Sequence, residues 1–131
     1  MKFTNSSQPI SMADIASFKK KYDFLLPESY ERIILKFNGG YPERRFFDES
    51  PVYFRPIKYG NFTIEDSLYA LDSSVRPARY IPFADIPGAV LFIDGNGQPV
   101  NIYRMYEDGD LEKIAPSFDA FMDALEFEEE D

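Results

Sequence analysis

The side chains that do most chemistry near neutral pH are missing from this sequence, which contains no cysteine and no histidine. Without histidine the chain lacks the usual general base and the commonest metal ligand, so serine–histidine triads and most zinc sites are excluded. Without cysteine it has no disulfides, thiolate metal sites or cysteine nucleophiles. The remaining candidates for chemistry are the 23 carboxylates and the glycine-rich turns.

Two glycine-rich segments resemble a calcium loop and a phosphate-binding loop, and the many carboxylates raise the question of a catalytic pair. Asp94–Gln98 alternates oxygen side chains with glycine, but an EF-hand would need glycine and glutamate where Pro99 and Met105 stand. Asn38–Gly40 lacks the spacing and the Lys-Thr pair of a phosphate loop, so a helix end explains it better. No spacing singles out two acids for glycosidase chemistry. We therefore expect no catalytic residue, no metal and no cofactor.

The net charge of −9 argues against nucleic acid as a partner, because phosphate binding needs a basic stripe. Arg44–Phe47 mixes cations with aromatic rings that could stack bases, but arginines in salt bridges beside core rings are the simpler interpretation.

The charge is also unevenly distributed along the chain. Met1–Glu65 carries 10 Lys and Arg against 8 Asp and Glu, a net charge of +2, whereas Asp66–Asp131 carries 4 against 15, a net charge of −11. From Glu107 onward there are eleven acids and one base, Lys113. Such a density could steer a basic partner by long-range attraction. The alternative is that the acids keep a small protein soluble and that residues 126–131 form a frayed acidic tail.

With 131 residues the chain is expected to form a single domain. The first ten residues contain no apolar stretch of signal-peptide length, and the longest apolar run, Ala89–Ile93, is too short to span a bilayer. We therefore expect a cytoplasmic protein that does not bind membranes.

Helix signals stand at both ends of the chain. Ser11 and Asp14 form a capping box before a helix whose apolar residues end at Tyr22. Pro27 is suited to start a second helix, and Gly39 to stop it in a left-handed conformation. Ser117 starts a last helix, in which Phe118, Phe121, Met122 and Leu125 form one apolar face.

Extended segments fill the middle of the chain. Val52–Arg55 and Asn61–Ile64 predict a hairpin around Gly60, followed by one or two helical turns in Glu65–Leu71 and a loop in Ser73–Pro77. Four later runs predict an antiparallel meander with turns at Gly95–Gly97 and Asp108-Gly109: Tyr80–Phe83, Ala89–Asp94, Val100–Tyr106 and Leu111–Ile114. The predicted fold class is α+β, an antiparallel-rich twisted sheet with two N-terminal helices and one C-terminal helix packed on it.

The turn at Asp108-Gly109 is the candidate contact surface. Thirteen Phe and nine Tyr fill mainly the core, but tyrosine is also enriched at protein interfaces. Tyr103 and Tyr106 lie at odd separation on one strand and should face opposite sides of the sheet, so one of them is a candidate exposed contact. The predicted partner-binding residues are Tyr106, Glu107, Asp108, Asp110 and Glu112.

Three segments in order resemble the SUKH superfamily of Smi/Knr-like domains. They are LPESYERIILKFNGGYP (Leu26–Pro42), IPFADIPGAVLFIDGNGQ (Ile81–Gln98) and IAPSFDAFMDAL (Ile114–Leu125). The residues that carry the resemblance, expected to be mainly structural, are Leu26, Pro27, Tyr30, Asn38, Gly39, Gly40, Pro82 and Asp94. The chain departs from the family pattern at Pro87–Ala89, where glycine-glycine is common, and Glu43–Arg79 matches least.

The resemblance implies an α+β domain without catalytic residues. In bacteria it implies an immunity protein that binds and neutralises a toxin, often a nuclease, inside the producing cell, and in fungi a regulator that acts through protein contacts. Our main hypothesis is an immunity protein whose partner is a basic toxin domain. The alternatives are an intracellular regulatory scaffold that binds a host protein and, more remotely, a carboxylate-based hydrolase. The sequence leaves the oligomeric state open.

Overall fold

The computed structural model describes residues 2–70, 79–96 and 100–127. These residues form an α+β fold, as predicted. The helices are α1 (Met12–Tyr22), α2 (Glu28–Lys36), α3 (Ile64–Ala70) and α4 (Phe118–Asp123). The strands are β1 (Phe3–Thr4), β2 (Tyr41–Pro42), β3 (Phe46–Phe47), β4 (Ser50–Pro51), β5 (Tyr53–Phe54), β6 (Tyr80–Ile86), β7 (Ala89–Asp94), β8 (Ile102–Tyr106) and β9 (Leu111–Ala115).

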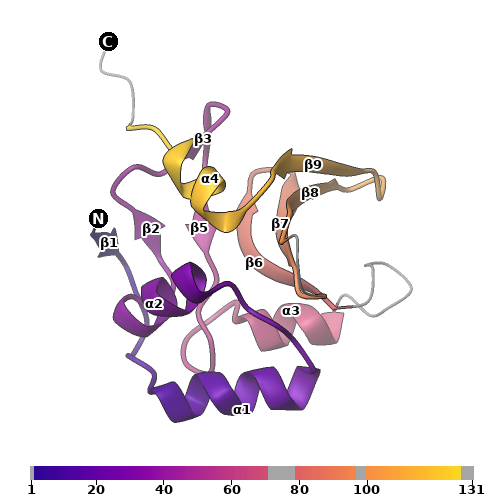
Figure 1. The fold of residues 1–131 in the computed structure, drawn as a ribbon. Coiled ribbons are helices and arrows are strands. Elements are labelled where there is room, and N and C mark those ends of the chain that lie inside the picture. The colour runs from indigo at the N-terminus through magenta and orange to yellow at the C-terminus, as the bar shows by residue number, and fades with distance from the viewer. Residues whose placement is uncertain (1, 71–78, 97–99, 128–131) are drawn as a thin grey trace.

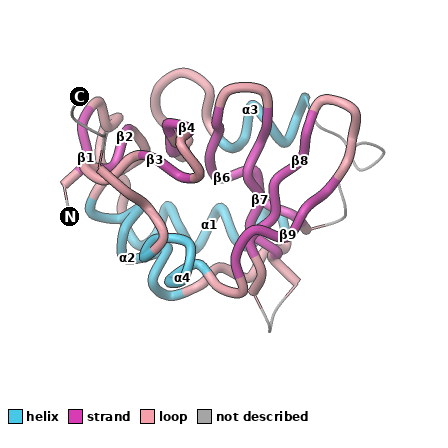
Figure 2. Tube along the Cα trace, turned by 90° about the horizontal axis from the view of Figure 1, so that it is seen from above, coloured by secondary structure: helices cyan, strands magenta, loops and turns pink. Residues whose placement is uncertain are grey.

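The main sheet has five antiparallel strands in the order β5-β6-β7-β8-β9. In Figure 1, α2 and α4 lie on one side of this sheet, while α1 and α3 lie beneath it. The small pairs β1-β2 and β3-β4 stand at the side of α2 and α4 (Figure 2). The hairpin of β8 and β9 extends away from the helices.

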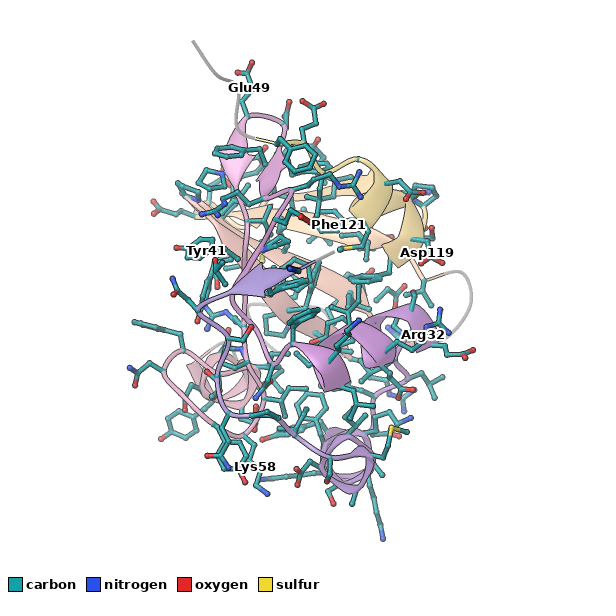
Figure 3. The ribbon with its side chains drawn as sticks, turned by 90° about the vertical axis from the view of Figure 1, so that its left-hand side faces the viewer. Arg32, Tyr41, Glu49, Lys58, Asp119 and Phe121 are labelled. Atoms are coloured by element: carbon teal, nitrogen blue, oxygen red, sulfur yellow. The ribbon has the colours of Figure 1, made fainter. Side chains whose placement is uncertain are left out.

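Aromatic rings hold the helices against the sheet. Tyr30 of α2 is fully buried, and its ring meets Phe83 of β6 and Phe118 of α4 edge-on, with centroids 6.1 and 5.4 Å apart. Phe121 of α4 lies 5.6 Å from Phe83 and stacks on Phe47 of β3 at 5.2 Å. Figure 3 shows Phe121 pointing into the interior. Such ring pairs add to the stability gained from buried area, so one cluster joins both ends of the chain to the sheet.

Helices α1 and α4 begin at the residues that the sequence predicts. The Ser11 hydroxyl accepts from the Asp14 backbone N–H at 3.1 Å, and the Asp14 carboxylate accepts from the Ser11 N–H at 2.9 Å, which completes the capping box. Ser117 caps α4 by accepting from the Ala120 N–H at 3.0 Å. The apolar face predicted for this last helix is buried.

The predicted role of Gly39 as a helix stop is wrong. Helix α2 ends at Lys36, and its C-cap Phe37 is extended rather than left-handed. Gly39 does have the predicted left-handed conformation, with a φ of +81°, but it lies beyond the helix. It passes the backbone of Phe54 and Pro56 so closely that a Cβ atom would collide with them. The glycine therefore permits close packing of two chain segments instead of ending the helix.

The predicted hairpin between Val52–Arg55 and Asn61–Ile64 is also wrong. Val52–Arg55 contributes to β5, which pairs with β6, whereas Ile64 begins helix α3. The Thr63 hydroxyl accepts from the Asp66 N–H at 3.1 Å, so the β-branched run contains a helix N-cap. Acids in the first turn of α3 favour the helix further.

The meander from β6 to β9 is confirmed. Strand β7 has the predicted bounds, β8 begins two residues later than expected, and β6 continues to Ile86 past an irregularity between Pro82 and Ala84. Glu126 pairs with Phe46 through two backbone hydrogen bonds of 2.8 and 3.0 Å. The predicted loop in Ser73–Pro77, the end of the turn at Gly97 and the acids 128–131 lie outside the described residues.

Candidate partner-binding surface

The turn between β8 and β9 brings the five predicted contact residues together. The Tyr106 N–H donates to the Asp110 carbonyl at 3.1 Å, and the Gly109 N–H donates to the Tyr106 carbonyl at 2.9 Å. The Asp108 carboxylate accepts from the Asp110 N–H at 3.0 Å, and Gly109 adopts a φ of +90°. Aspartate and glycine thus fix the turn and leave all five predicted side chains exposed at one end of the sheet.

Arg104 supports this hairpin from the core side. Its side chain is 10% exposed, and its guanidinium lies 3.1 Å from a Glu112 carboxylate oxygen and 3.7 Å from Asp48. The guanidinium also lies 5.2 Å from the ring centroid of Tyr106, whose hydroxyl donates to Glu112 at 3.4 Å. The Nε atom of Arg104 is buried without a hydrogen-bond partner among the described residues. Arg104 therefore neutralises Glu112 and holds Tyr106 in place.

Sequence reasoning missed Arg104 and Asp48. A cation between the apolar residues of β8 was a usable signal, because a buried charge needs a partner. Asp48 lies in the turn between β3 and β4, and nothing in its sequence position links it to β8.

The other three acids of the hairpin carry unbalanced charge. Within the described residues, Glu107, Asp108 and Asp110 form no ion pair within 4 Å. A shallow hollow of about 360 Å³ lies beside Glu107, with Ile86, Val90 and Met105 among its other lining residues. The surface thus combines an apolar floor with one lining acid, Glu107, and with two further acids on the adjoining turn. This combination suits long basic side chains, whose methylene stems are apolar.

Tyr103 and Tyr106 face opposite sides of the sheet, as predicted. Tyr106 is 38% exposed and lies on Arg104. Tyr103 stacks on Tyr80 across the outer face, with ring centroids 5.1 Å apart. Of the two, Tyr106 is therefore the exposed tyrosine of the hairpin.

A second hollow, of about 540 Å³, lies beside β2 and β5 and is lined by Tyr41, Tyr53, Arg55, Asn61, Phe62 and Asp85. Arg55 binds Asp85 through two contacts, Nε to Oδ2 at 2.7 Å and Nη2 to Oδ1 at 2.9 Å. Burial raises the pKa of Asp85, although the arginine opposes this shift. Here the charges are already matched within the chain.

Arg45 does not form the predicted salt bridge. Its guanidinium lies 5.2 Å from the ring centroid of Tyr41, and no ion pair within 4 Å involves Arg44 or Arg45 in the described part of the chain. The neighbouring Phe47 packs on Phe121, so the aromatic half of the segment belongs to the core.

The residues of the family motif hold the scaffold together. Buried Asn38 donates to the carbonyls of Gln8 and Ile57 at 2.9 and 2.8 Å and accepts from the Ile57 N–H at 2.8 Å. Pro27 is the N-cap of α2, and Leu26 is half-buried beside it. Asp94 accepts from the Asn96 N–H at 3.0 Å and so shapes the turn after β7.

The remaining motif residues are also packed into the scaffold. Tyr30 and Pro82 are buried, and burial raises the pKa of Tyr30 above its ordinary value. At Gly40, which has a φ of +102°, a Cβ atom would collide with the backbone of the N-terminal segment. These positions therefore serve packing rather than contact with a ligand.

Two other kinds of site are absent from the described ranges. Residues 2–70, 79–96 and 100–127 contain no group of three or more carboxylates arranged to hold a metal ion. No helix in the same ranges is long and apolar enough to cross a membrane.

Comparison with known protein families shows what the chain is similar to. The model of the SMI1 / KNR4 family (SUKH-1) matches residues 9–124, which include every helix of the fold and all five residues of the predicted contact surface. No curated protein matches the chain significantly.

Proposed function

The chain belongs to the SMI1 / KNR4 family (SUKH-1), and on this premise we propose that it is a non-enzymatic immunity protein that binds and neutralises a basic toxin domain. One observation carries the proposal. Glu107, Asp108 and Asp110 stand on a fixed turn without an ion pair in the described part of the chain. Unpaired acids can also keep a small protein soluble, but three of them on one fixed turn concentrate negative charge where a basic partner can neutralise it.

A basic toxin fits this surface for a physical reason. A nuclease presents positive charge to its phosphate substrate, so an acidic protein can cover the same surface. Charges at the rim raise the association rate, while buried aromatic and apolar contacts slow dissociation. Tyr106 and the floor of Ile86, Val90 and Met105 would supply the second kind of contact.

Growth rescue tests the function. The chain is co-expressed with each toxin encoded beside its gene, and we expect one of them to be lethal alone and harmless with the chain. A partner that has no toxicity of its own would replace the proposal with a regulatory scaffold.

Charge reversal tests the surface. We expect Glu107→Lys with Asp110→Lys to weaken capture of the toxin by at least about tenfold and to lower its salt dependence, because two counterion-sensitive contacts are lost. The matched control reverses two exposed acids elsewhere that also lack an ion pair among the described residues, Glu43→Lys with Asp123→Lys, which gives the same net charge. Equal losses in both double variants would contradict the assignment of the hairpin.

A further inference from the structure

Strand β9 ends the main sheet with one side unpaired. It pairs with β8, and no other described segment forms a backbone hydrogen bond with Leu111–Ala115. In Figure 1 it forms the upper rim of the sheet, with α4 at one end and the hairpin turn at the other. An open edge of this kind is a template for another strand.

The register shows which groups of β9 point outward. Tyr106 and Asp110 are joined by a backbone hydrogen bond, and hydrogen-bonded and non-bonded pairs alternate along an antiparallel ladder. The pair of Arg104 and Glu112 is therefore of the bonded type, and the pair of Met105 and Leu111 is of the other type. Hence the N–H and C=O of Leu111 point away from β8, toward the open edge.

The charges along this edge select its occupant. Asp108 and Asp110 lie at the hairpin end of β9, and Asp119 lies in the first turn of α4, the helix that follows the other end of the strand (Figure 3). Glu112 lies on the strand itself, but Arg104 already neutralises it. Lys113 is the only base on the strand. A second copy of this chain would bring the same acids together, whereas an extended segment with basic side chains would neutralise them.

We propose that β9 accepts an extended, lysine- or arginine-bearing segment of the partner as an additional strand of the sheet. Backbone hydrogen bonds from the outward groups of β9 supply the affinity, and the flanking acids select basic side chains. This inference rests on the proposed function in one respect, that the partner is a basic protein.

The test uses the full chain and a capped peptide of about six alternating lysine and threonine residues, the usual length of a strand. We expect the amide of Leu111 to exchange its hydrogen about tenfold more slowly when the peptide is bound, because a new strand protects it. A peptide in which glutamate replaces lysine is the charge control and should not bind.

A matched pair of variants separates strand addition from charge attraction alone. Leu111→Pro removes an outward N–H without removing a hydrogen bond to β8, and Leu111→Thr keeps the N–H. We expect the threonine variant to bind the peptide as the wild type does and the proline variant to bind about fivefold more weakly, the effect of one lost backbone hydrogen bond. If the proline variant does not fold, exchange at Leu111 in the wild type decides.

Three results would overturn the inference: equal peptide binding by both folded variants, unchanged exchange at Leu111, or a dimer that Leu111→Pro dissociates. None of these results bears on the proposed function, which is contradicted if co-expression of the chain rescues growth from no toxin. Conversely, the chain could bind the peptide as expected and yet rescue growth from no toxin. That result would support strand addition at β9 and contradict the immunity function.

Discussion

The β8–β9 hairpin and the hollow beside β5 both expose charged and aromatic side chains, yet they differ in where each charge finds its partner. Beside β5, Asp85 is matched by Arg55 within the chain, with side-chain exposures of 28% and 14%. On the hairpin, Glu107, Asp108 and Asp110 lack an ion pair in the described residues. The first arrangement balances charge within the chain, and the second leaves charge unbalanced among the described residues, which we propose a partner neutralises.

The largest effect is expected from breaking the matched pair. Arg55→Met leaves the Asp85 carboxylate half-buried without its cation, and we expect the free energy of unfolding to fall by about 2 kcal/mol in urea titration. Affinity for the partner should not change.

The double variant Arg55→Met with Asp85→Leu is the control. It removes both charges and should return to within about 1 kcal/mol of the wild type. A single variant as stable as the wild type would show that the ion pair does not serve the fold.

A smaller loss of stability is expected when Arg104 is changed. This buried residue pairs with Glu112 within the chain and also contacts Tyr106 of the exposed hairpin. Arg104→Met removes the contacts with Glu112 and Tyr106, and we expect a loss of about 1 kcal/mol of unfolding free energy. The nuclear magnetic resonance shifts of Tyr106 should change as its ring loses its support. Arg104→Lys should retain part of the stability, because it keeps the charge but not the planar fork. Unchanged shifts of Tyr106 in the methionine variant would contradict the supporting role.

The smallest effect concerns pH. Lys58 lies 2.9 Å from Asp14 and, with the Ser11 cap, holds the pKa of Asp14 below its ordinary value of 3.8. A lowered folded-state pKa stabilises the protein above 3.8, and this stabilisation is lost as the pH falls through the folded-state pKa. Asp14→Asn should therefore flatten the acid limb of a plot of unfolding free energy against pH.

The raised pKa of Asp85 acts in the opposite direction. Its contribution is most favourable below 3.8 and declines as the pH rises through the folded-state pKa. Asp85→Asn should therefore steepen the acid limb that Asp14→Asn flattens. Glu43→Gln, which removes a carboxylate at an exposed site, is the control for Asp14→Asn. If both variants flatten the acid limb equally, the effect is not specific to the helix cap.

The sequence predicts best where a local rule decides the structure. The Ser11 capping box, the Ser117 helix start and the meander depend on short-range hydrogen bonds and alternation, and the structure contains all of them. The structure also contains the predicted turn between β8 and β9, since an Asp-Gly turn between two strands specifies its own geometry. The binding role of the residues around it stays a prediction.

The sequence fails where distant segments compete with a local preference. Asn61–Ile64 has the composition of a strand, but the Thr63 cap and the packing of Ile64 in the core favour a helix. Glycine commonly ends helices, but Gly39 instead packs closely against the backbone of Phe54 and Pro56, which are distant from it in the sequence. The contact of Asp48 with Arg104 depends on the placement of a separate hairpin, which no spacing in the sequence reveals.

The central claim is that the chain acts by covering a basic protein with its acidic hairpin. Its most direct test is the association rate constant with the toxin identified by growth rescue, measured against salt concentration for the wild type and for Glu107→Lys with Asp110→Lys. We predict a steep fall with salt for the wild type and a much shallower one for the variant. Identical salt dependence for the two proteins would contradict the claim.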